Sequence, residues 1–447
     1  MLSLNEALDR AQSLVAAARR AGADAADAVY GCDASSGVTV RLGQLEDVEN
    51  SESEHIGLRV FVGHRSASVS SSDLAPRTLD TLVERVIAMA REAPEDAYAG
   101  LAPEDRLMRK KLPSLDIEDH EIPGPAALRE RALAVEDAAR AVLGVTNSEG
   151  GGAGFGRAQV ALVTSHGFAG AYAGTSHSLW ASVLAGEGAG MQRDHASHTA
   201  RKLRDLEAAD AIGTRAGSRA VGRLNPKRVA SGTMPVIFDP RVGNSLIGHL
   251  IGAISGPAVT RKASFLLDRR GEPVLPATLN LIDNPHLQRG LRSRPFDGEG
   301  LPTAMKRIVD GGILTDWLLD SASARQLGLA PTGHATRGGG APGVGLSNVH
   351  LEGGTASAHE LMADVSRGLY VTELIGHGVN PVTGDYSRGA SGFLIENGSV
   401  GHAVAEVTIA GNLRDMFARL VAANDLSFRY AINVPTLRID GMTIAGE

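Results

Sequence analysis

Histidine is the residue type with the widest chemical scope in this chain, which has 447 residues and 14 histidines. His195 and His198 stand three residues apart in a segment that we predict to be helical, but their charged neighbours indicate a solvated surface. His249 is a lone histidine in the apolar helical stretch NSLIGHLIGAI, a setting typical of a core residue. His334 and His377 lie beside glycines in loops, where they can line a cavity. No spacing among these histidines predicts a metal site by itself.

Two further segments share only part of a catalytic or binding motif. GGGAGFG at 150–156 would need a following helix to hold a dinucleotide, and we predict a strand there instead. Ser387 in GDYSRG and Ser391 in GASG do not match the G-x-S-x-G motif of a hydrolase nucleophile. An independent hydrolase built on Ser387, Asp385 and His377 is the least favoured alternative, because nothing in the sequence sets their geometry.

Composition disfavours several classes of function. The 51 acidic residues outnumber the 44 basic ones, which gives a net charge of −7 and argues against direct nucleic-acid binding. Cys32 is the only cysteine, so the chain can form neither an internal disulfide nor a cysteine-rich zinc site. No apolar run approaches the ~20 residues of a membrane span, and the N-terminus lacks the apolar stretch of a signal peptide. We therefore predict a cytoplasmic protein without nucleic-acid or membrane contacts.

The periodicity of apolar residues predicts an α+β protein. Residues 3–21 and 73–93 have helical spacing, and the segment between them alternates apolar and polar residues as antiparallel strands do. This predicts an N-terminal α/β domain over residues 1–95, within a protein whose overall class is α+β. The proline-rich, charged stretch 96–125 is predicted to be a linker.

The order of elements then repeats in a middle α+β segment at 126–230. A helix at 126–142 precedes strands at 145–188, and 194–224 is predicted to be helical again, which suggests a duplicated architecture. Residues 231–447 are predicted to form a β-rich C-terminal domain with short helices and glycine-rich loops.

The longest motifs of the C-terminal half resemble the TldD/PmbA family. They include PVIFDPRVGNSLIGHLIGAISGPAVTRKASFL, DGGILTDWLLDSASARQLGL and LYVTELIGHGVNPVTGDYSRGASGFLIENG. The first segment, GVTVRLGQLEDVENSESEHIGLRVFVGHRSASVSSSDL, is similar to the N-terminal domain of that family. TGHA at 332–335 and GDYSRGASGF at 384–393 point to the TldE (PmbA) branch. The resemblance covers nearly the whole chain.

The resemblance implies an intracellular peptidase built from two homologous subunits. The TldD-type subunit is expected to hold one zinc through a helical HExxxH motif and a later cysteine, with the glutamate as general base. On NSLIGH, Asn244 takes the place of the first histidine, Ser245 that of the glutamate and His249 that of the second histidine. The segment NDLSFRYAINVPTLRIDG near the C-terminus has no cysteine. Because an amide is a weak zinc ligand and a serine is no general base, we expect no metal, no cofactor and no catalytic residue in this chain.

We therefore interpret the chain as the non-zinc subunit of a heterodimeric metallopeptidase whose zinc lies in a TldD-type partner. The resemblance implies unfolded peptide substrates, including peptides that undergo maturation and antitoxin-like proteins, and a peptide could be held as an added strand. The alternative is a homodimer that binds peptides without cutting them. The family is also labelled a modulator of DNA gyrase, which the acidic charge leads us to interpret as an indirect link.

The loop GHGVNPVTGDYSRGASG is interpreted first as structural or interface-forming and second as contacting substrate. Its candidate residues are His377, Asn380, Asp385, Tyr386, Ser387 and Arg388.

Overall fold

The computed structural model describes residues 1–447, and its first half repeats one order of elements: a helix, three strands and a helix. This is the repetition that the sequence suggested. The first set is α1 (Leu4–Arg20), β1 (Ala25–Arg41), β2 (Gln44–Val62), β3 (Arg65–Ser71) and α2 (Pro76–Glu92). The second set is α3 (Pro125–Arg140), β4 (Val145–Thr164), β5 (Ala169–Ala185), β6 (Gln192–Ala200) and α4 (Ala209–Gly222).

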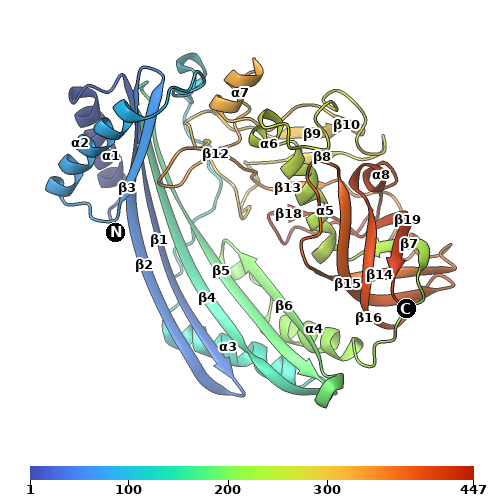
Figure 1. The fold of residues 1–447 in the computed structure, drawn as a ribbon. Helices are drawn as coiled ribbons and strands as arrows, with labels where there is room; N and C mark the ends of the chain where they lie inside the picture. The colour runs from blue at the N-terminus through green and yellow to red at the C-terminus, as the bar shows by residue number, and fades with distance from the viewer.

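The six strands of both sets form one antiparallel sheet in the order β3-β2-β1-β4-β5-β6. The two sets meet at β1 and β4, where Asp27–Val40 pair with Gly151–Thr164. The predicted units 1–95 and 126–230 therefore share a continuous sheet, which is the long curved sheet of Figure 1.

All four helices of this half pack on one face of the long sheet. Side chains of β1 such as Tyr30 share a core with α1 and α2, and Val38 and Val40, farther along the same strand, share a second core with α3 and α4. Local signals start the helices: Ser3 and Glu6 form a capping box at α1, and α2 and α3 begin with proline.

No helix of the chain combines the length and the apolar character needed to cross a membrane.

One predicted helix is wrong at its start. Gln192–Ala200 form β6, which pairs with β5, and the helix α4 begins only at Ala209. The segment alternates inward-facing Asp194 and Ala196 with outward-facing His195 and Ser197, which is the period of a strand. Apart from Ala196 and Ala200 its side chains are polar, so no apolar pattern stands out and pairing with β5 decides its conformation.

The predicted linker 96–125 contains only one short 3₁₀ turn, Glu104–Arg106, and yet it is packed. Leu101, Leu107 and Ile117 are buried within it. Arg325 donates to the carbonyls of Tyr98, Gly100 and Leu101 at 2.7, 2.9 and 3.0 Å. The segment is therefore a packed layer between the long sheet and the C-terminal half.

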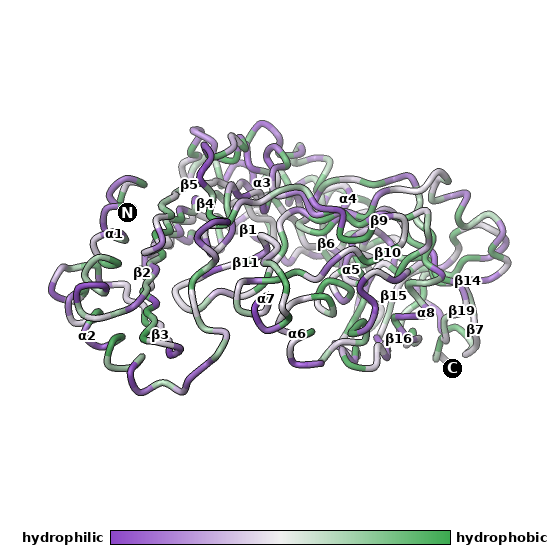
Figure 2. Tube along the Cα trace, turned by 90° about the horizontal axis from the view of Figure 1, so that it is seen from above, coloured by the Kyte–Doolittle hydropathy of each residue, from purple (hydrophilic) through white to green (hydrophobic).

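The C-terminal half contains a second six-stranded sheet in the order β16-β15-β14-β7-β19-β17, and β16 also pairs with β19. It lies at the opposite end of the molecule from α1 and α2 (Figure 2). Its strands are β7 (Gly232–Phe238), β14 (Arg367–Ile375), β15 (Asp385–Glu396), β16 (Ser399–Asn412), β17 (Val421–Ala422) and β19 (Leu437–Ala445).

Smaller elements surround this second sheet, and most share with it the largest core of the protein. The helices are α5 (Pro240–Ala253), α6 (Gly256–Thr260), α7 (Ser321–Leu327) and α8 (Leu413–Ala418). The strands are β8 (Leu281–Asp283), β9 (Lys306–Asp310), β10 (Ile313–Leu314), β11 (Ala335–Thr336), β12 (Gly343–Val344), β13 (Val349–Leu351) and β18 (Ile432–Asn433).

Asp27 of β1 joins the long sheet to the C-terminal half. Its side chain is 1% exposed and lies between Arg59 of β2 and Arg337, which follows β11. Arg59 Nε donates to Asp27 Oδ2 at 3.1 Å, and an Arg337 guanidinium nitrogen lies 2.5 Å from Oδ1. Burial by itself raises the pKa of the Asp27 carboxyl, but the charges of Arg337 and Arg59 more than offset it, so this pKa lies below its ordinary value.

We expect Asp27→Asn to lower the free energy of unfolding by about 3–5 kcal/mol at neutral pH, because it leaves two buried guanidinium groups without a carboxylate. Urea denaturation measures this loss. Since the folded-state pKa is depressed, the carboxylate stabilises the fold above the ordinary pKa of about 3.9 and loses that effect as the pH falls through the folded-state pKa. The gap between wild type and variant should therefore shrink in acid.

Asp47→Asn is the matched control, since Asp47 is exposed on β2. It should change the stability by no more than about 0.5 kcal/mol. Equal stability of the two variants would contradict the role of Asp27.

Candidate functional site

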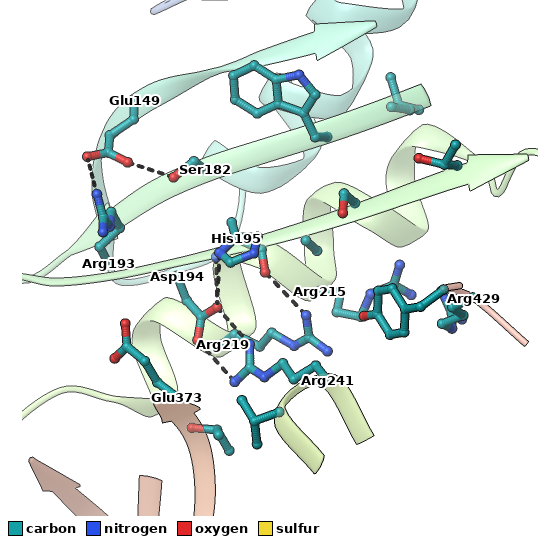
Figure 3. Close-up of a pocket in the computed structure, with 18 of the residues that line it drawn as sticks. Glu149, Ser182, Arg193, Asp194, His195, Arg215, Arg219, Arg241, Glu373 and Arg429 are labelled. Atoms are coloured by element: carbon teal, nitrogen blue, oxygen red, sulfur yellow. Dashed lines mark hydrogen bonds and ion pairs between the residues drawn. The ribbon is translucent and has the colours of Figure 1, made fainter. Parts of the chain in front are cut away.

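The main cleft of the protein, with a volume of about 930 Å³, lies between the long sheet and the C-terminal half. Its walls come from β5, β6, α4, the first turn of α5, β14 and the segment Arg429–Tyr430. Figure 3 shows charged side chains from both halves pointing toward one another there. A second cavity of about 440 Å³ shares Thr199, Arg429 and Tyr430 with the cleft and extends the concave surface.

The sheet side of the cleft depends on glycines of β4. Alternation places Ser178, Trp180 and Ser182 of β5 on the face away from α3 and α4. A Cβ atom at Gly152 would lie 2.4 Å from Nε1 of Trp180, so the indole rests directly on the β4 backbone. The GGGAGFG segment is part of β4, and no helix follows it as a dinucleotide site requires.

Asp194 of β6 is the buried anion of the cleft. Its carboxylate accepts from Arg241 at 2.8 and 3.3 Å, and Arg223 Nη1 lies 3.5 Å away. Burial raises the pKa of Asp194, but the charge and hydrogen bonds of Arg241, with help from Arg223, lower it below the ordinary value. Asp194 therefore stays ionised and holds the start of α5 against β6.

Asp239 sets the position of α5. Its side chain accepts the N–H of Arg241 at 2.9 Å as the N-cap, and Pro240 fills the first helical position. Tyr370 of β14 donates its hydroxyl to Asp239 at 2.8 Å. These contacts aim the first turn of α5 at the cleft, and Asn244, Ser245 and His249 follow along the helix without lining it.

The three α5 positions that the sequence singled out are half-buried. Ser245 donates its hydroxyl back to the carbonyl of Val242 at 2.7 Å. The ring of His249 lies edge-on to that of Tyr386, with centroids 6.2 Å apart, and its Nε2 is buried without a hydrogen-bond partner. Burial, followed by the charge of Arg388, lowers the pKa of His249.

The donor set around His249 does not fit a zinc ion. An imidazole, an amide and a hydroxyl engaged with its own helix supply no anionic ligand, and Arg388 places a positive charge nearby. In the whole structure, no three His, Cys, Asp or Glu side chains are grouped as metal ligands.

The structure separates the loop candidates into two groups. Tyr386 and Arg388 point inward from β15, and the Tyr386 hydroxyl and Arg388 Nε are both buried without partners. Burial raises the pKa of Tyr386 to about 12, so the hydroxyl is neutral at physiological pH. Together with His249 they form a polar cluster between α5 and β15.

The remaining loop candidates, His377, Asn380, Asp385 and Ser387, are exposed. Asn380 accepts the N–H of Val382 at 2.9 Å, and Asp385 accepts the Thr383 hydroxyl at 2.6 Å, which lowers its pKa. Both side chains thus shape the turn before β15. No hydrogen bond joins Ser387, His377 and Asp385, so the geometry of a catalytic triad is not formed.

The other histidines have structural surroundings. His195 and His198, three residues apart in the segment predicted to be helical, lie on opposite faces of β6, and His198 Nδ1 accepts the N–H of Glu207 at 3.0 Å. His334 is buried, with Nε2 3.3 Å from Asp283 and Nδ1 2.8 Å from the Thr332 hydroxyl.

The sequence did not single out the arginines of the cleft, because they are scattered between residues 193 and 429.

Models of one protein family match almost the whole chain. They are described as PmbA/TldA metallopeptidase domain 1 at residues 27–90, central domain at 118–224 and C-terminal domain at 231–446. Metalloprotease PmbA of Escherichia coli O157:H7 is 39% identical over 412 residues, which cover 92% of this chain and 90% of that protein. A PmbA homologue from Haemophilus influenzae is 37% identical over 96% of this chain and 94% of its own length.

Solved structures share the fold over its full length. A proposed modulator of DNA gyrase from Bacteroides thetaiotaomicron superimposes with a TM-score of 0.92 at 28% identity and covers 100% of both chains. TldE from Thermococcus kodakarensis superimposes with a TM-score of 0.87 at 21% identity, covering 98% of this chain and all of its own. The expected α+β class and the expected family are both confirmed.

Two tyrosines that contact α5 allow a test of the polar cluster. We expect Tyr386→Phe to leave the free energy of unfolding unchanged or to raise it, because the lost hydroxyl makes no well-aligned hydrogen bond and has only the Arg388 guanidinium nearby. Tyr370→Phe is the matched control and should lose about 1.5–3 kcal/mol, because its hydroxyl donates to the Asp239 carboxylate. Urea denaturation compares the two, and a larger loss in Tyr386→Phe would show that its hydroxyl is bonded in solution.

Proposed function

Because the chain belongs to the PmbA/TldD family of metallopeptidases, we propose that it serves as the non-zinc subunit of a heterodimeric metallopeptidase. The observation that carries the proposal is the donor set on α5. By the family resemblance, Asn244, Ser245 and His249 stand where the TldD-type subunit is expected to carry its zinc-binding motif, and they supply one imidazole and no carboxylate. In this role a TldD-type partner provides the zinc and activates the water.

A long uncovered edge supports a different subunit as the partner. Residues 56–62 of β2 pair with β3, whereas 44–55 pair only with β1 and leave the outer edge free. This free edge carries Glu46, Asp47, Glu49, Glu52 and Glu54. Like charges opposite one another disfavour pairing of this edge with the same edge of a second copy. A partner with a different charge pattern would meet no such repulsion.

The other edge of the long sheet supports unfolded peptides as substrates. β6 is the terminal strand, pairs only with β5 and borders the cleft. A peptide that adds to such an edge is held by main-chain hydrogen bonds, which need little sequence preference. An unfolded peptide has free main-chain groups for such pairing, whereas those of a folded protein are mostly bonded within its own structure. We place this activity in the cytosol, with peptides undergoing maturation and antitoxin-like proteins as substrates.

The homodimeric peptide-binding protein is the second candidate, and the free β6 edge is the observation that favours it as well. It differs from the first proposal in requiring no TldD-type partner and no hydrolysis.

The link to DNA gyrase in the name of the Bacteroides structure belongs to that protein. For this chain, with a net charge of −7, we propose only an indirect link, through turnover of another protein.

Zinc content and activity of the reconstituted complex test the proposal. We expect the purified chain to contain no stoichiometric zinc by elemental analysis and to leave a fluorescence-quenched, unstructured peptide intact. After mixing with a TldD-type subunit from the same source, the peptide should be cleaved, and a chelator should abolish cleavage. One tightly bound zinc in this chain would contradict the donor-set argument.

His249→Ala is the control variant, because we assign no metal to His249. It should leave the zinc content of the complex unchanged. If the chain instead associates with itself and binds peptide, and does not associate with the TldD-type subunit, the homodimer replaces the heterodimer as the proposed assembly.

A further inference from the structure

Six arginines line the main cleft, although the chain as a whole is acidic. They come from β6, α4, the residue after α4, α5 and the segment before β18. Figure 3 shows several of these guanidinium groups gathered around Asp194. The six are Arg193, Arg215, Arg219, Arg223, Arg241 and Arg429.

Five of the six arginines have carboxylate partners. Glu207 contacts Arg215 and Arg429 at 2.5 Å each, and Glu149 lies 3.4 Å from Arg193. Asp194 contacts Arg223 and Arg241, as described above. Glu373 also contacts Arg223, and Asp239 Oδ1 lies 3.7 Å from Arg241 Nε. These five carboxylates balance five of the six positive charges. The positive charge without a counter-ion therefore resides on one side chain, Arg219.

Arg219 donates Nη1 to the carbonyl of His195 at 3.2 Å and has no carboxylate within ion-pair distance. It is half-buried, and its guanidinium lies beside that of Arg241 in Figure 3. Burial and the neighbouring charge of Arg241 lower the pKa of Arg219. An anion in contact with Arg219 would compensate both effects.

Two buried polar atoms on the opposite wall have no partner either. Thr372 of β14 is 5% exposed, and its Oγ1 is without a hydrogen bond. Arg241 Nε is also buried and makes no hydrogen bond, since Asp239 Oδ1 lies 3.7 Å away. Both residues line the same cleft as Arg219. Buried polar atoms are normally satisfied, so these donors point to a ligand with oxygen acceptors.

The surroundings indicate what carries those oxygens. The cleft borders the free edge of β6, and its volume of about 930 Å³ lies within the range of about 300–1,000 Å³ typical of ligand sites. Trp180 and Tyr430 add flat apolar surface to its walls. Planar guanidinium groups match a carboxylate through two parallel hydrogen bonds. Near His195 the strand edge is already occupied, because Asp194 accepts its N–H and Arg219 donates to its carbonyl.

We propose that the cleft is a carboxylate-binding subsite for peptides, in which Arg219 binds either the C-terminal carboxylate or an acidic side chain of the peptide. The subsite rests on the proposed function only in taking a peptide as its ligand. It would fix the position of one carboxylate of the peptide beside the edge of β6, next to the point where strand pairing is blocked at His195.

Binding of three neutral-labelled peptides to the full-length chain tests this proposal by fluorescence anisotropy. The first peptide has uncharged side chains and a free C-terminal carboxylate, the second is its C-terminal amide, and the third is the amide with one internal glutamate. We expect the first to bind roughly tenfold more tightly than the second, as a hydrogen-bonded charge pair would give. Tight binding of the third would assign the subsite to acidic side chains, and weak binding would assign it to the chain terminus.

Substitutions in the cleft separate recognition from folding. Arg219→Gln should remove the preference for the carboxylate, Arg219→Lys should keep part of it, and Thr372→Val should weaken binding without lowering stability. Arg109→Gln is the control, since Arg109 is an exposed arginine outside the cleft. Thermal unfolding of each variant confirms that it is folded.

Equal affinity of the wild-type chain for all three peptides would overturn the subsite, and so would a preference for either carboxylate that survives in Arg219→Gln. Absence of binding by any of the peptides would overturn it as well. The proposed function fails differently: the peptides bind with the expected preference, and the complex with the TldD-type subunit does not cleave them.

Discussion

Buried ion pairs at the two ends of the long sheet hold the C-terminal half in place, and the cleft depends on them. At one end, Asp27 of β1 binds Arg337, and at the other, Asp194 of β6 binds Arg241. In both pairs a strand of the sheet supplies the carboxylate and the C-terminal half supplies the guanidinium. A buried charge is costly without its partner, so each pair fixes how the two halves pack against one another, and loss of either member leaves a buried charge uncompensated.

The same constraint places the first turn of α5 at the cleft, whereas the candidate motif positions Asn244, Ser245 and His249 lie farther along that helix. Its first turn is tied to the sheet through Arg241 and Asp194, and Asp239 caps it. Beyond that turn, His249 faces Tyr386 and Arg388 instead of further zinc ligands. In the proposed complex this subunit contributes recognition and enclosure, and the bond-breaking chemistry belongs to its partner.

The elements with strong local signals were predictable. The apolar period of α1, with Ser3 and Glu6 at its start, and the repeated order of helix and strands needed no tertiary information. β6 was predicted as a helix, because its small polar side chains favour neither conformation and pairing with β5 decides. In a helix, the three-residue spacing would bring His195 and His198 near one face, whereas the strand places them on opposite sides.

The sequence was enough to predict the fold class and the family. The side chains at positions 244, 245 and 249 led to the proposal of a non-zinc subunit, because an amide, a hydroxyl and one imidazole are a poor zinc donor set. The tertiary structure alone decided that the two α+β units share one sheet, that the stretch 96–125 is packed, and that Arg219 lies in a cleft without a counter-ion. Local periodicity carries no information about which strand edges meet or which distant charges share a cavity. Long-range pairing and burial set those contacts, and they also decide whether a given arginine is solvated or poised to bind an anion.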